Sequence, residues 1–239
     1  MIFSRRVLID GFDNIRDLGG FQTSDGHITK MGVFFRSESL FHISEKHLTE
    51  LKNHNIFNCI DIHGPIDNSG IVHPFEADKE CKYYCIPVLS DLINHTGTEK
   101  DNFQVEYWIQ VNTRMLENNK DWICSVMKRC ADTTNGTVIH CRTGKSRTSL
   151  ISMLIMSIAN IPQVDISAEF STTDVYMERK YAELLKTSNH AKGFYQSPAF
   201  IMDKTVEYLI TNYGDVNNYL TKCGLEKNDI EKIHHKFVI

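Results

Sequence analysis

The 239-residue sequence predicts an α/β fold, with a mixed, mainly parallel sheet flanked by helices and a helical C-terminal third. Three observations point to it: short β-rich segments fill the first third, a strand–loop–helix unit lies in the middle, and helical patterns follow residue 161. The five prolines form no Pro-rich tract, and no linker is evident. We therefore expect a single domain over 1–239, with a sheet-rich core at about 1–160 and a helical addition at about 161–239.

The strands are predicted from β-rich and apolar runs bounded by turn residues. Ser24-Asp25-Gly26 is a turn signal between two of the early runs. The later runs are continuously apolar, as in a sheet covered on both faces. The predicted strands are 7–12, 27–30, 32–35, 56–62, 83–88 and 137–140.

The helices are predicted from apolar residues at three- and four-residue steps. In 44–53, Ser44 is a cap and Leu48 and Leu51 share one face. The apolar run 150–161 contains Ser152 and Ser157 and is too short to cross a membrane, so it predicts a buried helix. The other predicted helices are 102–131, 177–186, 197–213 and 215–222.

Composition excludes several classes of function. The net charge is −4 and there is no basic run, so we expect no nucleic-acid partner. The apolar run Val7–Ile9 is too short for the core of a signal peptide. We expect a cytoplasmic protein, or one secreted without a classical signal, with no stable membrane insertion. The oligomeric state stays open.

The seven cysteines include no C-x-x-C pair and no cluster with zinc-like spacing. A disulfide framework, a metal site and a cofactor are therefore not expected. Six of the cysteines are predicted to be small buried apolar residues in a reducing compartment. Cys141 is the exception, because it stands at the head of a distinctive loop.

Residues 140–148 have the sequence His-Cys-Arg-Thr-Gly-Lys-Ser-Arg-Thr. A strand is predicted to end at His140 and a helix to open at Arg147. This geometry directs backbone N–H groups and the positive end of a helix dipole at one point, where a phosphate dianion fits. The candidate phosphate-binding residues are Arg142, Thr143, Gly144, Lys145, Ser146 and Arg147.

Roles follow from the side chains of this loop. Cys141 is the candidate nucleophile, since the same field favours its thiolate form, and Arg147 is a bidentate phosphate ligand. Thr148 can hydrogen-bond the sulfur and help it leave, and His140 is expected to order the loop rather than react. A nucleotide-binding P-loop fails on spacing, because its first glycine would fall at Ile139.

Three stretches together resemble the cysteine-dependent protein tyrosine phosphatase superfamily. They are the Asn-Ile-Arg-Asp-Leu-Gly-Gly opening at 14–20 with Phe-Arg-Ser at 35–37, the loop at 140–148, and the helical signature at 213–225. The chain looks most like the bacterial atypical tyrosine, dual-specificity and phosphoinositide phosphatases with this opening. The resemblance implies a tyrosine-phosphatase-like fold over nearly the whole chain and a phosphorylated protein or phosphoinositide as the substrate.

Arg142 and Lys145 add two cations to the loop. The resemblance to lipid phosphatases suggests that they bind a second phosphate or an inositol headgroup. The alternative is that they raise the field of the loop or face solvent.

The general acid is the least determined residue. Ser146 stands where related bacterial loops have Asp, and Asp61-Ile62-His63 stands where they have Asp-Leu-Arg. Asp61, at a predicted strand end, is the first candidate and Asp91 the second, although either could be a turn residue or a helix cap. Arg16 and Arg36 are candidates for bracing the loop, not for catalysis.

We therefore predict a metal-independent phosphomonoester hydrolase with a phosphocysteine intermediate, acting on phosphotyrosine, with phosphoserine, phosphothreonine or phosphoinositides as further candidates. An inactive phosphate-binding module is the main alternative, because of Ser146 and His63. A sulfur-transfer domain is a third. The polar stretch 91–104 is expected to border the pocket.

Overall fold

The fold is seen in a computed structural model that describes residues 4–63, 72–88 and 106–239. Its sheet has five strands in the order β1-β2-β5-β3-β4. β1 is antiparallel to β2, and the other neighbours are parallel, which confirms the mixed, mainly parallel sheet. The strands are β1 (Arg16–Asp17), β2 (Phe34–Ser37), β3 (Ile56–Asp61), β4 (Lys82–Cys85) and β5 (Gly136–His140).

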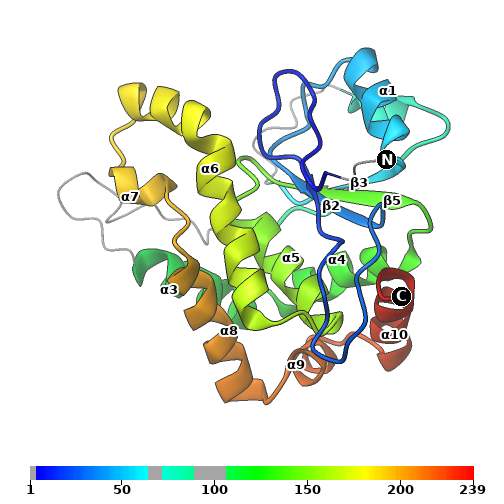
Figure 1. Cartoon of the computed structure of the whole chain (residues 1–239), viewed down its shortest axis with the longest axis vertical. Helices are drawn as coiled ribbons and strands as arrows, with labels where there is room; N and C mark the ends of the chain where they lie inside the picture. The colour runs from blue at the N-terminus through cyan, green and yellow to red at the C-terminus, as the bar shows by residue number, and fades with distance from the viewer. Residues whose placement is uncertain (1–3, 64–71, 89–105) are drawn as a thin grey trace.

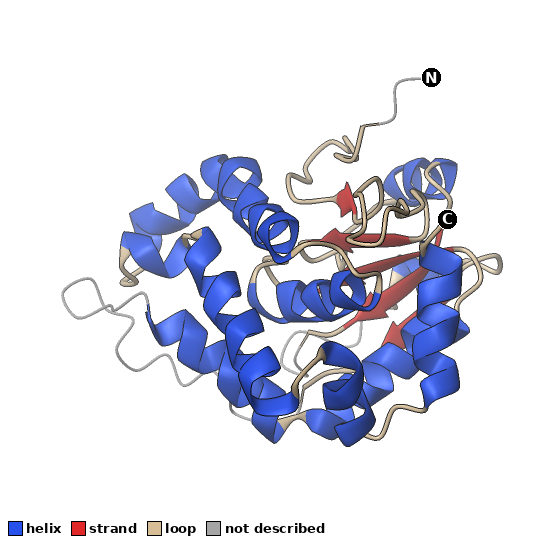
Figure 2. Cartoon of the chain, turned by 60° about the horizontal axis from the view of Figure 1, so that its bottom comes forward, coloured by secondary structure: helices blue, strands red, loops and turns tan. Residues whose placement is uncertain are grey.

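Helices cover both faces of the sheet (Figures 1 and 2). The helices described are α1 (Glu45–Asn53), α2 (Pro74–Ala77), α3 (Glu106–Asn118), α4 (Lys120–Asp132), α5 (Ser146–Ile158), α6 (Gln163–Thr187), α7 (Lys192–Tyr195), α8 (Ala199–Tyr213), α9 (Val216–Lys222) and α10 (Lys227–Phe237). The helical C-terminal third is thereby confirmed.

Alternation along the strands divides the core in two. Cys59 and Val138 pack with Phe75 of α2 in one apolar cluster, which also holds the buried face of α1. Ile60 and Ile139, their neighbours in sequence, belong to the larger cluster around α4, α5 and α8–α10. Successive side chains of a strand point to opposite faces, so β3 and β5 supply both cores. The larger cluster joins the predicted sheet-rich core to the predicted helical addition.

Two predicted strands are wrong. Residues 7–12 and 27–30 form only isolated bridges, among them Ile9 with Phe12 and Thr29 with Val238. The first segment turns back on itself, and Gly11 there has a positive φ of 79°. The second pairs with the C-terminal residues: Ile28 and Ile239 exchange N–H···O hydrogen bonds, and the Lys30 N–H donates to Phe237 O. The extended backbone of these segments is therefore paired outside the sheet, and composition alone does not tell the two cases apart.

The predicted helix at 44–53 is confirmed with its cap. Ser44 accepts a hydrogen bond from the His47 N–H, and His47 returns one to the Ser44 N–H. Within the described residues, the predicted helix 102–131 is two helices, because the chain bends at Asn119. α10 lies in the region after residue 161 that was predicted to be helical, without bounds of its own, and it buries Ile233 and Phe237.

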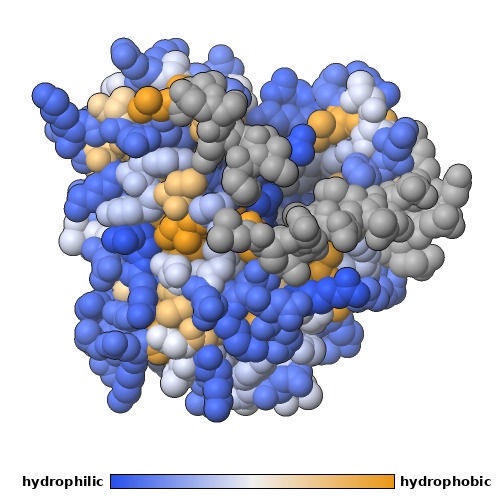
Figure 3. All heavy atoms as spheres, turned by 180° about the vertical axis from the view of Figure 1, so that it is seen from behind, coloured by the Kyte–Doolittle hydropathy of each residue, from blue (hydrophilic) through white to orange (hydrophobic). Residues whose placement is uncertain are grey.

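The described helices include none that is long and apolar enough to cross a membrane. Hydrophilic residues dominate the face turned away from the viewer in Figure 1, with small apolar patches between them (Figure 3).

Candidate active site

The predicted loop joins β5 to α5, which begins at Ser146, one residue before the predicted start. Cys141 is 2% exposed, and the Thr148 hydroxyl donates to its Sγ at 3.0 Å. The first turn of α5 contains no acidic residue, and no side chain in the described part of the chain caps it. Its first N–H groups and the positive end of its dipole can therefore receive an anion.

Gly144 allows the loop to turn. Its φ is +68°, and a Cβ built on it would lie 2.4 Å from the Ser37 carbonyl oxygen. A side chain is excluded twice, by the left-handed backbone and by the end of β2. Only glycine therefore fits at this position, where the loop packs against the end of β2.

Hydrogen bonds from outside the loop hold its carbonyl groups. Asn14 Nδ2 donates to Thr143 O at 3.0 Å, and Arg36 Nη2 donates to Gly144 O. The Ser39 N–H donates to Arg142 O at 3.1 Å. With its carbonyls bound on the outside, the loop can turn its N–H groups inward.

A buried ion triad anchors these braces. Glu169 of α6 receives Arg16 Nε at 2.5 Å and Arg36 Nη1 at 2.6 Å, and all three side chains are about 1% exposed. Burial would raise the pKa of Glu169, but the charges of Arg16 and Arg36 lower it to about 2. Arg16 Nη1 also donates to Asn14 Oδ1, so the triad positions both side chains that bind the loop. The bracing predicted for Arg16 and Arg36 has this geometry.

A pocket of about 340 Å³ opens over the loop. Cys141 and the loop side chains line its base. The walls come from α3 and from the stretch at the end of α6 and through α7. The aromatic wall residues are Trp108, Tyr181, His190, Phe194 and Tyr195. Sequence reasoning missed this wall, because the residues lie 33 positions or more from Cys141 and share no periodic pattern with it.

Lys145 contacts the aromatic wall of the pocket. Its Nζ donates to Phe194 O at 2.6 Å and lies 4.2 Å from the centre of the Trp108 ring. The side chain is buried, and burial lowers the pKa of Lys145 well below its ordinary value. Arg142, in contrast, is exposed at the pocket. The two loop cations therefore have different surroundings.

The remaining loop side chains lie at or beside the pocket. Arg147 is half-buried and its Nη1 donates to Ile62 O at 3.3 Å, which keeps the guanidinium at the pocket. Ser146 Oγ is buried and has no hydrogen-bond partner within the described residues. Thr143 lines the pocket as well.

The geometry does not support the predicted role of Asp61 as general acid. Its carboxylate accepts from the Tyr83 hydroxyl at 2.7 Å and from the His63 N–H at 2.8 Å, and it is not among the residues that line the pocket. Burial raises its pKa, but His140, Tyr83 and His63 together lower the pKa of Asp61 below its ordinary value. A buried, ionised carboxylate is a poor proton donor. Asp91 and the stretch 91–104 lie outside the described residues.

His140 is fully buried beneath the start of the loop. Its Nδ1 is 3.9 Å from Asp61 Oδ1, and burial is the main cause that lowers the pKa of its imidazole. The residue therefore faces the sheet side of the loop, away from the pocket, as expected of a residue that orders the loop.

Comparisons with known proteins show which family and which proteins this chain is similar to. The sequence model of a family described as the tyrosine phosphatase family matches residues 7–239. The chain is 23% identical over 237 residues to a Cupriavidus necator protein with a provisional tyrosine-protein phosphatase name, covering 90% of this chain and 82% of that protein. It is 23% identical over 160 residues to a tyrosine-protein phosphatase of Nostoc commune, covering 59% of this chain and 54% of that protein. A similar solved structure, the core catalytic domain of the PP-IP phosphatase SIW14 from S. cerevisiae, has a TM-score of 0.32 and 14% identity, covering 80% of this chain and 93% of that one.

The ion triad generates a stability prediction. Glu169→Gln leaves two buried arginine charges uncompensated, so the free energy of unfolding is expected to fall by about 3–5 kcal/mol in urea denaturation at pH 7. Glu183→Gln, on the exposed face of the same helix, is the control and should change it by less than about 0.5 kcal/mol. Equal effects of the two substitutions would contradict the anchoring role.

The triad also predicts a pH dependence. The folded pKa of Glu169 is lowered to about 2 from an ordinary value of 4.5, so its contribution is present above pH 4.5 and is lost as the pH falls towards 2. Between these values, wild type should lose more stability than Glu169→Gln. Parallel losses would show that other carboxylates govern acid unfolding.

Proposed function

The chain belongs to the tyrosine phosphatase family, and on that premise we propose that it is a metal-independent phosphomonoester hydrolase that works through a phosphocysteine intermediate. The observation that carries the proposal is the placement of Cys141 beneath the free N-terminus of α5, with the Thr148 hydroxyl at 3.0 Å from its sulfur. A thiolate beneath a cradled phosphate is arranged for nucleophilic phosphoryl transfer.

In the proposed reaction, the Cys141 thiolate attacks phosphorus in line with the ester oxygen. A P–S bond forms as the P–O bond breaks, and the leaving oxygen takes a proton. Water then attacks the phosphocysteine, releasing inorganic phosphate and returning the electron pair to sulfur. Arg147 and the loop N–H groups bind the equatorial oxygens in both steps. The hydrogen bond from Thr148 stabilises the departing thiolate in the second step.

Phosphotyrosine is the proposed principal substrate. The pocket walls include Trp108 and Phe194, whose ring centres are 5.0 Å apart, above a base that contains Cys141. A phenyl ring in the pocket can pack against this pair of rings while its phosphate reaches the loop. Phosphoserine and phosphothreonine are shorter and would leave the walls uncontacted, so they are proposed as weaker substrates.

Phosphoinositides stay a second candidate substrate class because Arg142 is an exposed cation at the pocket. Its guanidinium is free to bind a second phosphate on the same ligand. Lys145 is not a candidate for binding the second phosphate, since its ammonium already donates to Phe194 O. The proposed headgroup contact therefore rests on Arg142 alone.

The second candidate function is a phosphate-binding module without turnover. It is favoured by the position of Asp61, which leaves the pocket without an Asp or Glu among its described lining residues, and by Ser146 at a position where related loops have Asp. The intact set of Cys141, Arg147 and Thr148 supports catalysis instead. Turnover decides between the two.

The deciding experiment measures phosphate release in EDTA from a phosphotyrosine peptide, a phosphoserine peptide and a phosphatidylinositol monophosphate. We expect turnover on phosphotyrosine that Cys141→Ser abolishes, with retention of phosphate-analogue binding by the variant. Absence of turnover by folded wild type on every substrate would favour the binding module. Turnover that survives Cys141→Ser would refute the cysteine mechanism.

The two loop cations should respond differently. Arg142→Ala is expected to lower kcat/KM on a phosphatidylinositol bisphosphate by about 10-fold and to change phosphotyrosine hydrolysis by less than about 3-fold, because only a second phosphate uses it. Lys145→Ala should lower kcat/KM on both substrates alike, since it removes the hydrogen bond that holds the aromatic wall against the loop. A uniform effect of Arg142→Ala would remove the headgroup proposal.

The proton donor is tested by pH profiles. Asp61→Asn should keep the fall in rate on the alkaline side of the optimum, because an ionised buried carboxylate supplies no proton. Loss of a true general acid costs about 10²–10⁴ on aryl phosphates and removes that fall. Asp91→Asn is the matched variant. If the alkaline fall disappears in Asp61→Asn and persists in Asp91→Asn, the assignment from geometry is wrong.

A further inference from the structure

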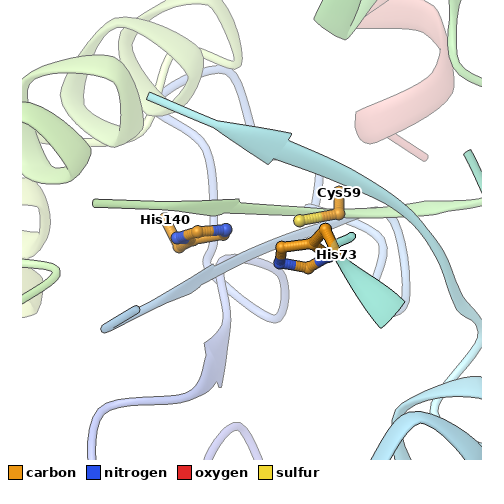
Figure 4. A group of neighbouring side chains, drawn as sticks. All are labelled: Cys59, His73 and His140. Atoms are coloured by element: carbon orange, nitrogen blue, oxygen red, sulfur yellow. The ribbon is translucent and has the colours of Figure 1, made fainter. Parts of the chain in front are cut away.

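Three potential metal ligands converge behind the catalytic loop. Cys59 of β3, His73 at the cap of α2 and His140 at the end of β5 each offer one donor atom, and these atoms lie within 4.8 Å of one another. Figure 4 shows the three side chains gathered beside the strands. All are 1% exposed or less. The described residues contain no second group of this kind.

The polar atoms of this cluster are poorly satisfied. Both ring nitrogens of His140, and Nε2 of His73, are buried without a hydrogen-bond partner in the described part of the chain. His73 also stacks on Tyr83, with ring centres 4.2 Å apart and planes at 13°. Buried imidazole nitrogens without partners are uncommon and call for an explanation. A bound cation would satisfy one nitrogen of each ring.

We propose that Cys59, His73 and His140 bind one borderline-soft divalent cation, with Zn²⁺ as its probe. A thiolate and two imidazoles are the donors that Zn²⁺ prefers, at about 2.3 Å for sulfur and 2.0–2.1 Å for nitrogen. Mg²⁺ and Ca²⁺ require oxygen donors and are disfavoured. A tetrahedral site brings its donors to about 3.5 Å from one another, a modest contraction from 4.8 Å.

The fourth position has a ready occupant. Asp61 Oδ1 lies 3.9 Å from His140 Nδ1 but is not within 4.8 Å of all three donor atoms, so a water molecule, or the carboxylate after a small movement, would complete the tetrahedron. The partners of Asp61, Tyr83 and His63, would then hold a ligand in place from outside the site.

Proton balance limits the affinity. Zn²⁺ replaces the thiol proton of Cys59, which passes to solvent. His73 Nδ1 accepts the Phe75 N–H at 3.3 Å. Binding through Nε2 moves the His73 proton to Nδ1 and breaks this cap bond. Net release is one proton per ion, and the lost cap makes the site reversible instead of a permanent structural centre.

The site is placed to affect catalysis. His140 directly precedes Cys141, and its register partner in β3 is Asp61. Contraction of the ligands around a cation would pull His140 towards β3 and α2 and displace the start of the loop. Zinc binding is therefore expected to lower the rate; this consequence rests on the proposed function, whereas the binding does not.

The binding test uses Cys141→Ser, so that the catalytic thiol cannot hold the ion. Calorimetric titration with Zn²⁺ in two buffers of different ionisation enthalpy should give one ion per chain, a dissociation constant on the order of micromolar, and about one proton released. Adding Cys59→Ala or His73→Asn should weaken binding at least about tenfold. Mg²⁺ should not bind.

Controls separate ligand loss from misfolding. Cys130→Ala removes an equally buried thiol from α4, remote from the cluster, and should bind Zn²⁺ as the parent does. His73→Asn keeps a side-chain acceptor for the α2 cap, so it decides the matter if Cys59→Ala does not fold. Unchanged affinity in folded Cys59→Ala and His73→Asn would overturn the site.

The activity arm compares each protein with its own zinc-free rate. At zinc near the measured dissociation constant, wild type should lose about half of its activity and Cys59→Ala little. Equal inhibition of the two would place the inhibitory ion at Cys141 and overturn the regulatory effect. Because binding is measured in an inactive background, failure of the proposed function leaves the binding result intact.

Discussion

The shape of the loop at 140–148 depends on one buried carboxylate. Glu169 of α6 lies between Arg16 and Arg36, and through them it positions two of the side chains that hold the loop carbonyls. A buried triad of this kind contributes little to stability compared with an apolar core, because desolvation offsets the attraction. Its role here is geometric, because the ion pairs fix the positions of both arginine side chains. These positions in turn set the shape of the loop.

The same arrangement explains why the helical addition matters to the site. α6 provides Glu169 to the braces and Tyr181 to the pocket wall, and the stretch that follows it provides Phe194. Lys145 closes this connection by donating to Phe194 O from within the loop. The addition therefore determines both the shape of the anion cradle and the shape of what can approach it.

The sheet separates two environments at the head of the loop. On the pocket side, Cys141 faces the N-terminus of α5 and the Thr148 hydroxyl. On the other side, Asp61 and His140 lie with Cys59 and His73 in a buried polar cluster. Because successive residues along a strand point to opposite faces, His140 and the next residue, Cys141, lie on opposite sides of the sheet. The proposed phosphate hydrolysis on one side and the proposed cation site on the other would thus both lie at the end of β5.

The sequence alone determined the strand–loop–helix unit that carries Cys141 and most helices, because these depend on local spacing and on residues within a few positions of one another. It misplaced 7–12 and 27–30, where β-rich residues form isolated bridges outside the sheet. Only the tertiary structure decided the direction of Asp61, the aromatic wall and the Cys59–His73–His140 cluster. Their partners come from separate elements, as with Asp61 and Tyr83, 22 residues apart, or Lys145 and Phe194, 49 residues apart. No local pattern encodes such pairs, since packing of the whole chain brings them together.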